Sequence, residues 1–332
     1  MAIEFSETVE EAQFYSPLAD FELDTQGVEY RRDPLTGQGT RVVAEWFPER
    51  EDEDVRPDID DEDCFFCPEL VEDATPEYPD YVGVDRGSVG VATSFPNLFP
   101  YGTHSNVVVL TEEHFRPVGE LTADLLADGL ACALEYVHAA VAHDGSRFAS
   151  VNMNYLPSAG SSVLHPHLQA IVDDHGTNET RRRLDAARDY YDSHGRTYWT
   201  DLLEEERDGP RYVGRTGDVS WVAPFAPRSQ YHVTGVTDVT GIPDPDDTVV
   251  EDLAAGIENV LACYDERGLD AFNFALRAIR DEPASPVVVD IVARPAFEEE
   301  YVNDAFYLQA LHDERVVDVA PEEYGPDVGA FF

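Results

Sequence analysis

The sequence predicts an α+β fold built from two related halves, and three observations support this. Apolar residues recur at three- and four-residue spacing over residues 121–143 and 248–266, which predicts two long amphipathic helices. Each helix precedes two short runs rich in β-branched residues, which predict paired strands. These strands are expected at 149–154, 168–172, 272–278 and 287–292. The repeated order indicates a weak internal duplication, with a second copy starting near residue 206.

The remaining segments complete the two halves. Polar residues 1–28 are expected to form a loosely held N-terminal arm, followed by one half at 29–205 and another at 206–332. An acidic loop is expected at 49–63, and a proline-rich turn at 95–100. Further strands are predicted at 41–47, 87–93, 106–110, 219–225 and 230–236, and helices with polar faces at 178–193 and 198–207.

The charge balance is extreme. The 332 residues include 68 acidic and 22 basic side chains, giving a net charge of −46. Such a surface repels nucleic-acid phosphates, so no nucleic-acid partner is expected. The acidic residues are spread among ordinary apolar patterns, which argues against disorder. Molar salt shortens the screening length to ~3 Å, and this composition resembles that of haloarchaeal proteins adapted to such solvent.

Every basic residue other than histidine is arginine, because the chain contains no lysine. Phosphate chemistry would therefore depend on arginine, backbone N–H groups, histidine or a metal, and a lysine Schiff base is excluded. The N-terminus has neither a basic region nor an apolar stretch, and no apolar run of the length of a membrane span is seen. A cytoplasmic protein without a membrane partner is expected.

The motif His165-Pro166-His167 lies in the segment 154–169. Residues two apart on an extended strand point to the same side, so both imidazoles face one way. Such a pair serves as two metal ligands, as one ligand plus one nucleophile, or as a hydrogen-bonded structural pair. The glycine and serines at 160–162 are expected to offer backbone N–H and hydroxyl donors to an anion. A neutral imidazole beside a bound phosphate can attack phosphorus and store a nucleotidyl group.

A second candidate site is the C-x-x-C pair of Cys64 and Cys67. Alone, this pair is compatible with zinc, redox chemistry, a disulfide or chance. No second C-x-x-C is present, so a zinc site would need histidines, and His114 and His165 are the natural candidates. A closed site of two cysteines and two histidines would be structural and would fix the backbone beside His167.

Taken together in order and spacing, the motifs resemble the galactose-1-phosphate uridylyltransferase family of the histidine triad superfamily. The matching features run over most of the chain. They are Arg31 with Asp33-Pro34-Leu35-Thr36-Gly37, Cys64 and Cys67, Phe95-x-Asn97-x-Phe99, Gly102-Thr103-His104 leading to His114, Asn154, Ser162, His165-Pro166-His167 and Gln169.

The resemblance implies two tandem histidine-triad halves, each a mainly antiparallel half-barrel with packed helices. It also implies a ping-pong reaction in which His167 is the nucleophile and carries a nucleoside monophosphate, most simply UMP. The donor would be a nucleotide sugar and the acceptor a sugar 1-phosphate, in carbohydrate and specifically galactose metabolism. A homodimer is implied as well. The family's zinc ligands correspond to Cys64, Cys67, His114 and His165.

Substrate contacts are implied for seven further residues. Ser162 and Gln169 would contact the transferred phosphate, and Arg31 would reach the nucleotide phosphates. The base and ribose would be framed by residues from the other matched motifs, namely Phe95, Asn97 and Phe99, with Asn154 against the ribose or phosphate. His104 matches a recurrent family histidine, for which a structural role is expected.

The chain departs from the family in its second half. The strand at 287–292 has no histidine pair, so no second metal site is expected, and residues 304–311 lack the family's lysine and Tyr-Glu pair. Leu98 follows Asn97, where well-known members have aspartate. These differences leave the acceptor and the base open. A related phosphorylase or hydrolase is an alternative, as is a zinc-stabilised nucleotide-binding protein without catalysis.

Overall fold

The structure is a computed structural model that describes residues 3–16, 21–43, 64–294 and 305–332. The strand expected at 41–47 is therefore described only up to residue 43, where strand β3 spans Gly39–Val42. The acidic loop expected at 49–63 lies outside the described residues.

One large sheet contains ten strands in the order β4-β5-β6-β8-β7-β12-β13-β11-β10-β9. Each paired neighbour is antiparallel. The bounds are Gly87–Val89 (β4), Ala92–Pro96 (β5), His104–Val109 (β6), Phe148–Tyr155 (β7), His167–Asp173 (β8), Tyr212–Thr216 (β9), Val219–Val222 (β10), Gln230–Thr240 (β11), Ala271–Ile279 (β12) and Pro286–Arg294 (β13). This large antiparallel sheet with packed helices confirms the predicted α+β class.

The strand order is symmetric about the central β7–β12 pair. Outward from it, β8, β6, β5 and β4 follow on one side, and β13, β11, β10 and β9 on the other. Helix α2 (Ala123–Asp144) connects β6 to β7, and α5 (Thr248–Glu266) connects β11 to β12 in the corresponding place. The structure therefore contains the tandem halves that the repeated pattern predicted.

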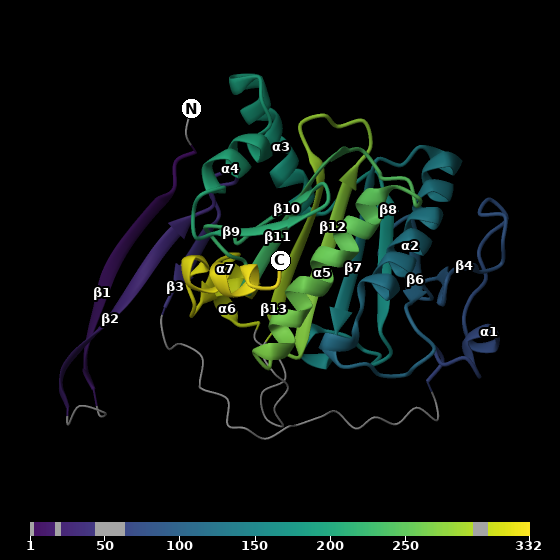
Figure 1. Ribbon diagram of the computed structural model, residues 1–332, viewed down its shortest axis with the longest axis horizontal. Coiled ribbons are helices and arrows are strands. Elements are labelled where there is room, and N and C mark those ends of the chain that lie inside the picture. The colour runs from purple at the N-terminus through teal and green to yellow at the C-terminus, as the bar shows by residue number, and fades with distance from the viewer. Residues whose placement is uncertain (1–2, 17–20, 44–63, 295–304) are drawn as a thin grey trace.

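Helices α2 and α5 lie side by side across one face of the large sheet (Figure 1). Their apolar sides and the residues of this sheet face form the main core, in which Leu168 and Leu130 are almost fully buried. Helix α2 is long and apolar enough to cross a membrane, with a mean hydropathy of 1.4, contrary to the expectation that no segment would be. Half of that stretch is buried in the protein, which is typical of a core helix.

The N-terminal arm forms a paired hairpin instead of the expected loose segment. Strand β1 (Ser6–Ser16) pairs along its full length with β2 (Glu22–Arg32), and the ribbon projects away from the large sheet (Figure 1). Strands β3 and β14 (Arg315–Val317) complete a four-stranded sheet in the order β1-β2-β3-β14. The described side chains of β1 are mostly exposed, so the alternating pattern that would predict a strand is missing.

The other helices surround the sheet edges and its second face. Their bounds are Val71–Ala74 (α1), Asn178–His194 (α3), Tyr198–Glu206 (α4), Tyr307–His312 (α6) and Pro321–Gly329 (α7). Helix α3 begins at the cap Thr177, whose hydroxyl accepts a hydrogen bond from the Thr180 N–H. Helix α4 packs Trp199 and Leu202 against Val236 and Val288 of the sheet, so this face is covered in the second half.

Candidate functional site

Strand β8 places its alternate residues on opposite faces of the large sheet. Leu168 and Ala170 point into the core beneath α2, whereas His167 and Gln169 lie on the face away from α2 and α5. By strand register, Asn152 on β7 lies directly opposite Gln169 on this second face. The sequence-predicted nucleophile therefore stands at the start of a row of polar side chains.

Four predicted metal ligands converge beside β8. The Sγ atoms of Cys64 and Cys67 and ring nitrogens of His114 and His165 all lie within 4.8 Å of one another. The Nδ1 atom of His165 is 3.8 Å from Cys64 Sγ and 3.6 Å from Cys67 Sγ, and Nδ1 of His114 is 3.5 Å from Cys67 Sγ. The expected grouping of these residues into one candidate metal centre is confirmed.

These distances fit a tetrahedral zinc ion. Zinc binds thiolate at ~2.3 Å and imidazole at ~2.0–2.1 Å, so sulfur and nitrogen ligands of one tetrahedral ion lie ~3.6 Å apart. The Nε2 atom of His165 lies 2.7 Å from the Thr111 carbonyl oxygen, which can only accept. The proton is therefore on Nε2, and the lone pair on Nδ1 faces the two sulfur atoms. The donor set and the tautomer both suit a closed structural site.

His167 is held in the opposite tautomer. Its Nδ1 atom lies 2.8 Å from the backbone carbonyl oxygen of His165, so Nδ1 donates and Nε2 carries the lone pair. The ring meets the Phe66 ring edge to face at 5.2 Å between centroids, and Val109 lies opposite it on β6. Burial lowers the pKa of this imidazole, which favours the neutral ring. A neutral Nε2 lone pair is the form that can attack phosphorus.

The loop before the histidine pair differs from the expectation. Two of the N–H groups expected to receive an anion are already bonded within the loop: Gly160 N–H donates to the Pro157 carbonyl and Ser161 N–H to the Leu156 carbonyl. The Ser161 hydroxyl donates to the Val163 carbonyl. The turn-rich sequence forms a short 3-10 helix, which uses these donors itself. Ser161 is buried, whereas Gly160 and Ser162 are exposed, so Ser162 is the exposed loop residue that has a side-chain hydroxyl.

A row of amides extends the face beyond His167. The Asn152 side chain donates to the Gln169 carbonyl at 3.2 Å. The next residue of β7 on this face, Asn154, accepts a hydrogen bond of 2.8 Å from the side chain of Asn273 on β12. Asn154 and Gln169 were predicted from the sequence, whereas Asn152 and Asn273 were not. Only the strand register brings the latter two to this face, and their alternation with apolar residues was the available signal.

The two rings of the aromatic motif at 95–99 differ in burial: Phe95 is buried and Phe99 is exposed. Phe95 is buried, with its ring 5.5 Å from that of Phe66, so it supports the wall beside His167. Phe99 is 76% exposed. The Asn97 carboxamide oxygen accepts a hydrogen bond from the Phe99 N–H and fixes the turn between them. Phe99 is thus the ring of this motif that a ligand can contact.

The structure does not bring Arg31 to this face. Its guanidinium is buried in the second half, bonded to Glu29 at 2.5 Å and to Glu322 at 2.8 Å, and stacked over the Phe225 ring. His104 has the expected structural role. Its ring bonds to Asp144 and to Tyr81, each at 2.8 Å, and so ties β6 to the end of α2.

Comparisons with known proteins agree with this architecture. No family model matches the chain. An uncharacterized protein of Archaeoglobus fulgidus is 35% identical over 329 residues, which cover 98% of each chain. The chain belongs to one family with this archaeal protein.

Solved structures show which fold this family has. An ADP-glucose phosphorylase from Arabidopsis thaliana, crystallised with ADP-glucose, matches with a TM-score of 0.70 at 18% identity, covering 91% of this chain and 97% of that one. A uridylyltransferase mutant matches with a TM-score of 0.66 at 19% identity, over 91% and 97% of the two chains. These two structures show that the chain has the fold of the uridylyltransferases, which is the fold that the motifs predicted.

Proposed function

We propose that the protein is a nucleotidyltransferase that moves a nucleoside monophosphate, in the first instance UMP, between a nucleotide sugar and a sugar 1-phosphate. The observation that carries this proposal is the tautomer of His167. Its Nδ1 proton is held by the His165 carbonyl, so an Nε2 lone pair is ready beside a polar sheet face. The same face carries Gln169 two residues along the strand, so the lone pair and a phosphate contact would lie together, which favours a catalytic over a purely structural histidine.

In the first half-reaction, Nε2 of His167 attacks the phosphorus next to the nucleoside. The Nε2–P bond forms, the bond from phosphorus to the bridging oxygen breaks, and the sugar 1-phosphate leaves with the bonding electrons. The Nδ1 proton stays on the ring, where the His165 carbonyl stabilises the positive charge that develops. In the second half-reaction, a phosphate oxygen of the acceptor attacks phosphorus and the Nε2–P bond breaks. No proton has to be moved in either step.

Gln169 and Ser162 are the proposed contacts of the transferred phosphate. Gln169 lies two residues from His167 on the same face of β8, and Ser162 is exposed on the preceding loop. We assign the base to the exposed ring of Phe99, with Asn97 holding its turn and Phe95 behind His167. Asn154 would lie against the ribose or phosphate. Arg31, in its buried ion pairs, contributes to the site only if those pairs with Glu29 and Glu322 break.

Zinc is the metal we propose for the cluster of Cys64, Cys67, His114 and His165. A bound zinc ion would cross-link residues 64–67 to the strand that carries His167. His165 would then serve twice, since its ring faces the metal while its backbone oxygen orients the nucleophile. We further infer that the protein works at high salt, because the net charge of −46 favours a strongly screened solvent. A homodimer in the cytoplasm is proposed from the family resemblance alone.

A phosphorylase is the second candidate, because an ADP-glucose phosphorylase has the same fold. In that reaction inorganic phosphate discharges the nucleotidyl-histidine in place of a sugar 1-phosphate. The two reactions share the first half-reaction and differ only in the acceptor.

An exchange experiment separates these candidates. The protein is incubated in molar KCl with UDP-glucose or ADP-glucose, and with radiolabelled galactose 1-phosphate, glucose 1-phosphate or inorganic phosphate. Label entering a nucleotide sugar supports the transferase, label entering a nucleoside diphosphate supports the phosphorylase, and label entering neither with any pair refutes both. His167→Gly is the matched control that must lose the exchange.

A further inference from the structure

A short row of polar side chains crosses the large sheet where its two halves meet. Met153 of β7 pairs with Leu168 of β8. The next residues along these two strands are Asn154 and His167, which are therefore neighbours on the opposite sheet face. On its other side, Asn154 pairs with Asn273 of β12. A side chain of the second half is thus separated from the proposed nucleophile by one residue, Asn154.

Two partners fix the orientation of the Asn273 carboxamide. The Ala159 carbonyl oxygen, which can only accept, lies 2.9 Å from Nδ2. A guanidinium N–H of Arg294, which can only donate, lies 2.6 Å from Oδ1. The amide therefore cannot be turned over without losing both hydrogen bonds.

The orientation of Asn273 determines that of Asn154. The Nδ2 group of Asn273 also donates to Oδ1 of Asn154, at 2.8 Å. The Asn154 amino group is therefore turned away from Asn273, and it is open to a ligand because the residue is exposed. Both amides line a cavity of about 460 Å³ on this face. Beside His167, Asn154 thus offers hydrogen-bond donors to a ligand and keeps its acceptor for Asn273.

Asn273 also holds the loop that precedes the histidine pair. The backbone of Leu156 has φ 69° and ψ 159°, a conformation that persists only where surrounding contacts enforce it. Its carbonyl accepts the N–H groups of Ala159 and Ser161. The Ala159 carbonyl in turn accepts the hydrogen bond from Asn273. Asn273 therefore helps to fix the loop that carries Ser162.

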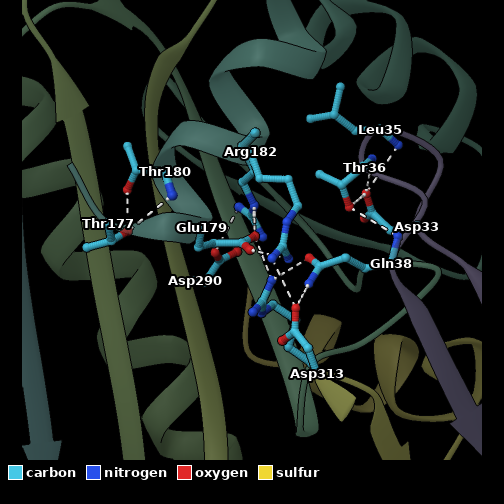
Figure 2. Close-up of polar contacts among 12 residues, drawn as sticks. Asp33, Leu35, Thr36, Gln38, Thr177, Glu179, Thr180, Arg182, Asp290 and Asp313 are labelled. Atoms are coloured by element: carbon cyan, nitrogen blue, oxygen red, sulfur yellow. Dashed lines mark hydrogen bonds and ion pairs between the residues drawn. The ribbon is translucent and has the colours of Figure 1, made fainter. Parts of the chain in front are cut away.

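Ion pairs support the second-half end of this row. Arg294, which orients Asn273, lies on β13 four residues from Asp290 and on the same face. Asp290 pairs with Arg183 at 2.9 Å, and Arg183 pairs with Glu179 of α3 at 2.8 Å. Figure 2 shows Asp290 and Glu179 within this network. The strand that orients Asn273 is thus cross-linked to a helix of the other half.

We propose that Asn273 is a positioning residue, which directs the Asn154 amino group at a non-bridging oxygen of the phosphate that His167 attacks. This inference rests on the function proposed above and gives a second-half residue a part in the first half-reaction. Non-bridging phosphate oxygens only accept hydrogen bonds, so they match a group that offers only donors. A ribose hydroxyl can be bound by either end of an amide and would not need this orientation.

The test is equilibrium binding to the full chain in molar KCl, with UMP against uridine and AMP against adenosine as probes. Each pair differs only in the phosphate. Isothermal titration is applied to the wild type, Asn273→Asp, Asn273→Ala, Asn154→Ala and the double variant Asn154→Ala with Asn273→Asp. Asn273→Asp keeps the size of the side chain and an oxygen for Arg294, but it removes the donor. Asn178→Asp, at an exposed amide that begins α3, is the matched control for the added charge.

We expect Asn273→Asp to weaken binding of the nucleoside monophosphate about tenfold to a hundredfold, as loss of one hydrogen bond to a charged group does. Binding of the nucleoside should not change, and Asn273→Ala should weaken binding of the monophosphate as well. In the Asn154→Ala background the further loss should be below about threefold, because the amide that Asn273 orients is gone. A loss caused by charge alone would persist there. Asn178→Asp should bind like the wild type.

Near-ultraviolet circular dichroism confirms folding, and if Asn273→Asp does not fold, Asn273→Ala decides alone. If nucleoside binding is too weak to measure, the comparison in the Asn154→Ala background decides.

Undiminished binding of the monophosphate in the folded variant would overturn the proposal. An equal loss for the nucleoside, or the same loss in the Asn154→Ala background, would do so too, as would a wild type that binds neither UMP nor AMP. The expected binding pattern without nucleotidyl transfer to any acceptor would refute only the proposed function. Transfer by the wild type with undiminished binding in Asn273→Asp would refute only the role of Asn273.

Discussion

The backbone carbonyl of His165 accepts a hydrogen bond of 2.8 Å from Nδ1 of His167. The same His165 directs its own Nδ1 towards the sulfur atoms of Cys64 and Cys67. One residue therefore connects the candidate metal centre with the candidate nucleophile. A change in the position of the His165 ring should shift its backbone carbonyl and with it the orientation of the His167 ring.

Loss of one thiolate should release the metal. We expect Cys64→Ser to lose most of its zinc, because a serine hydroxyl is a poor zinc ligand. Only three of the four donors of the tetrahedral site would then remain. Transfer activity should fall with it, since the His165 backbone is no longer fixed. Mass spectrometric metal analysis measures the zinc. Cys263→Ser, which changes a buried thiol of α5 outside the cluster, should retain it. Full zinc content in Cys64→Ser would rule out the cluster as the site.

Removal of the Gln169 amide should slow the transfer step. We expect Gln169→Ala to lower kcat by ~10²–10³-fold, the usual loss when one donor to a developing negative charge is removed. Zinc content should not change. Ile171→Val, two residues further along the same strand, is the matched control and should keep its activity. Steady-state kinetics with the best nucleotide sugar checks this, and wild-type rates for Gln169→Ala would exclude the proposed phosphate contact.

Truncation of Phe99 should affect binding without affecting stability. Its side chain is 76% exposed, so Phe99→Ala should change the free energy of unfolding by less than ~0.5 kcal/mol. Stacking of a base on an aromatic ring contributes ~1–3 kcal/mol, so KM for the nucleotide sugar should rise about tenfold or more. Leu98→Ala, at a neighbouring side chain that is 66% exposed, should leave KM unchanged. Equal KM values for both variants would place the base elsewhere.

The buried Asp290 pairs with Arg183 at 2.9 Å and with Arg277 at 2.5 Å, and these ion pairs should make the free energy of unfolding depend on pH. Burial alone would raise the pKa of Asp290, but attraction from Arg183 and Arg277 holds it well below its usual range. A carboxyl group with a depressed folded pKa stabilises the protein at neutral pH, and this contribution is lost as the pH falls below the unfolded value of ~3.9.

We therefore expect Asp290→Asn to lower the free energy of unfolding at pH 7 by about 3–5 kcal/mol, because it leaves buried arginines without their partner. The difference from the wild type should shrink between about pH 4 and pH 2. Guanidinium unfolding at both ends of this range measures it. Asp218→Asn, at an exposed ion pair, should lie within ~0.5 kcal/mol of the wild type throughout. A loss for Asp290→Asn that does not depend on pH would contradict this account.

Much of the fold and the metal centre could be predicted from the sequence. Zinc prefers thiolate and imidazole ligands, and the sequence offers such donors in Cys64, Cys67, His114 and His165. The helices α2 and α5 bury one continuous apolar stripe each, which is a pattern that sequence periodicity records directly. The sequence predicts that the His165 and His167 side chains point to the same side of the strand. It does not predict their hydrogen-bond partners, which are the Thr111 carbonyl for His165 and the His165 carbonyl for His167.

Features that depend on distant partners could not be predicted. Arg31 pairs with Glu322, and no local pattern records a contact between residues so far apart in the chain. The sequence predicts anion donors at Gly160 and Ser161, but a turn-rich sequence does not show which N–H groups the turn itself uses, and the structure bonds both of these within the loop. Asn152 reaches the site only through its register with Gln169, and strand register is set by the whole sheet.

The covalent intermediate is the most direct test of the central claim that His167 is a nucleophile. The wild type and His167→Gly are incubated with UDP-glucose and with ADP-glucose in molar KCl, without acceptor, and their intact masses are measured. We predict that the wild type gains the mass of one nucleoside monophosphate and that the variant gains none. A wild type that stays unmodified with every nucleotide sugar, or an equal adduct on His167→Gly, would contradict the account.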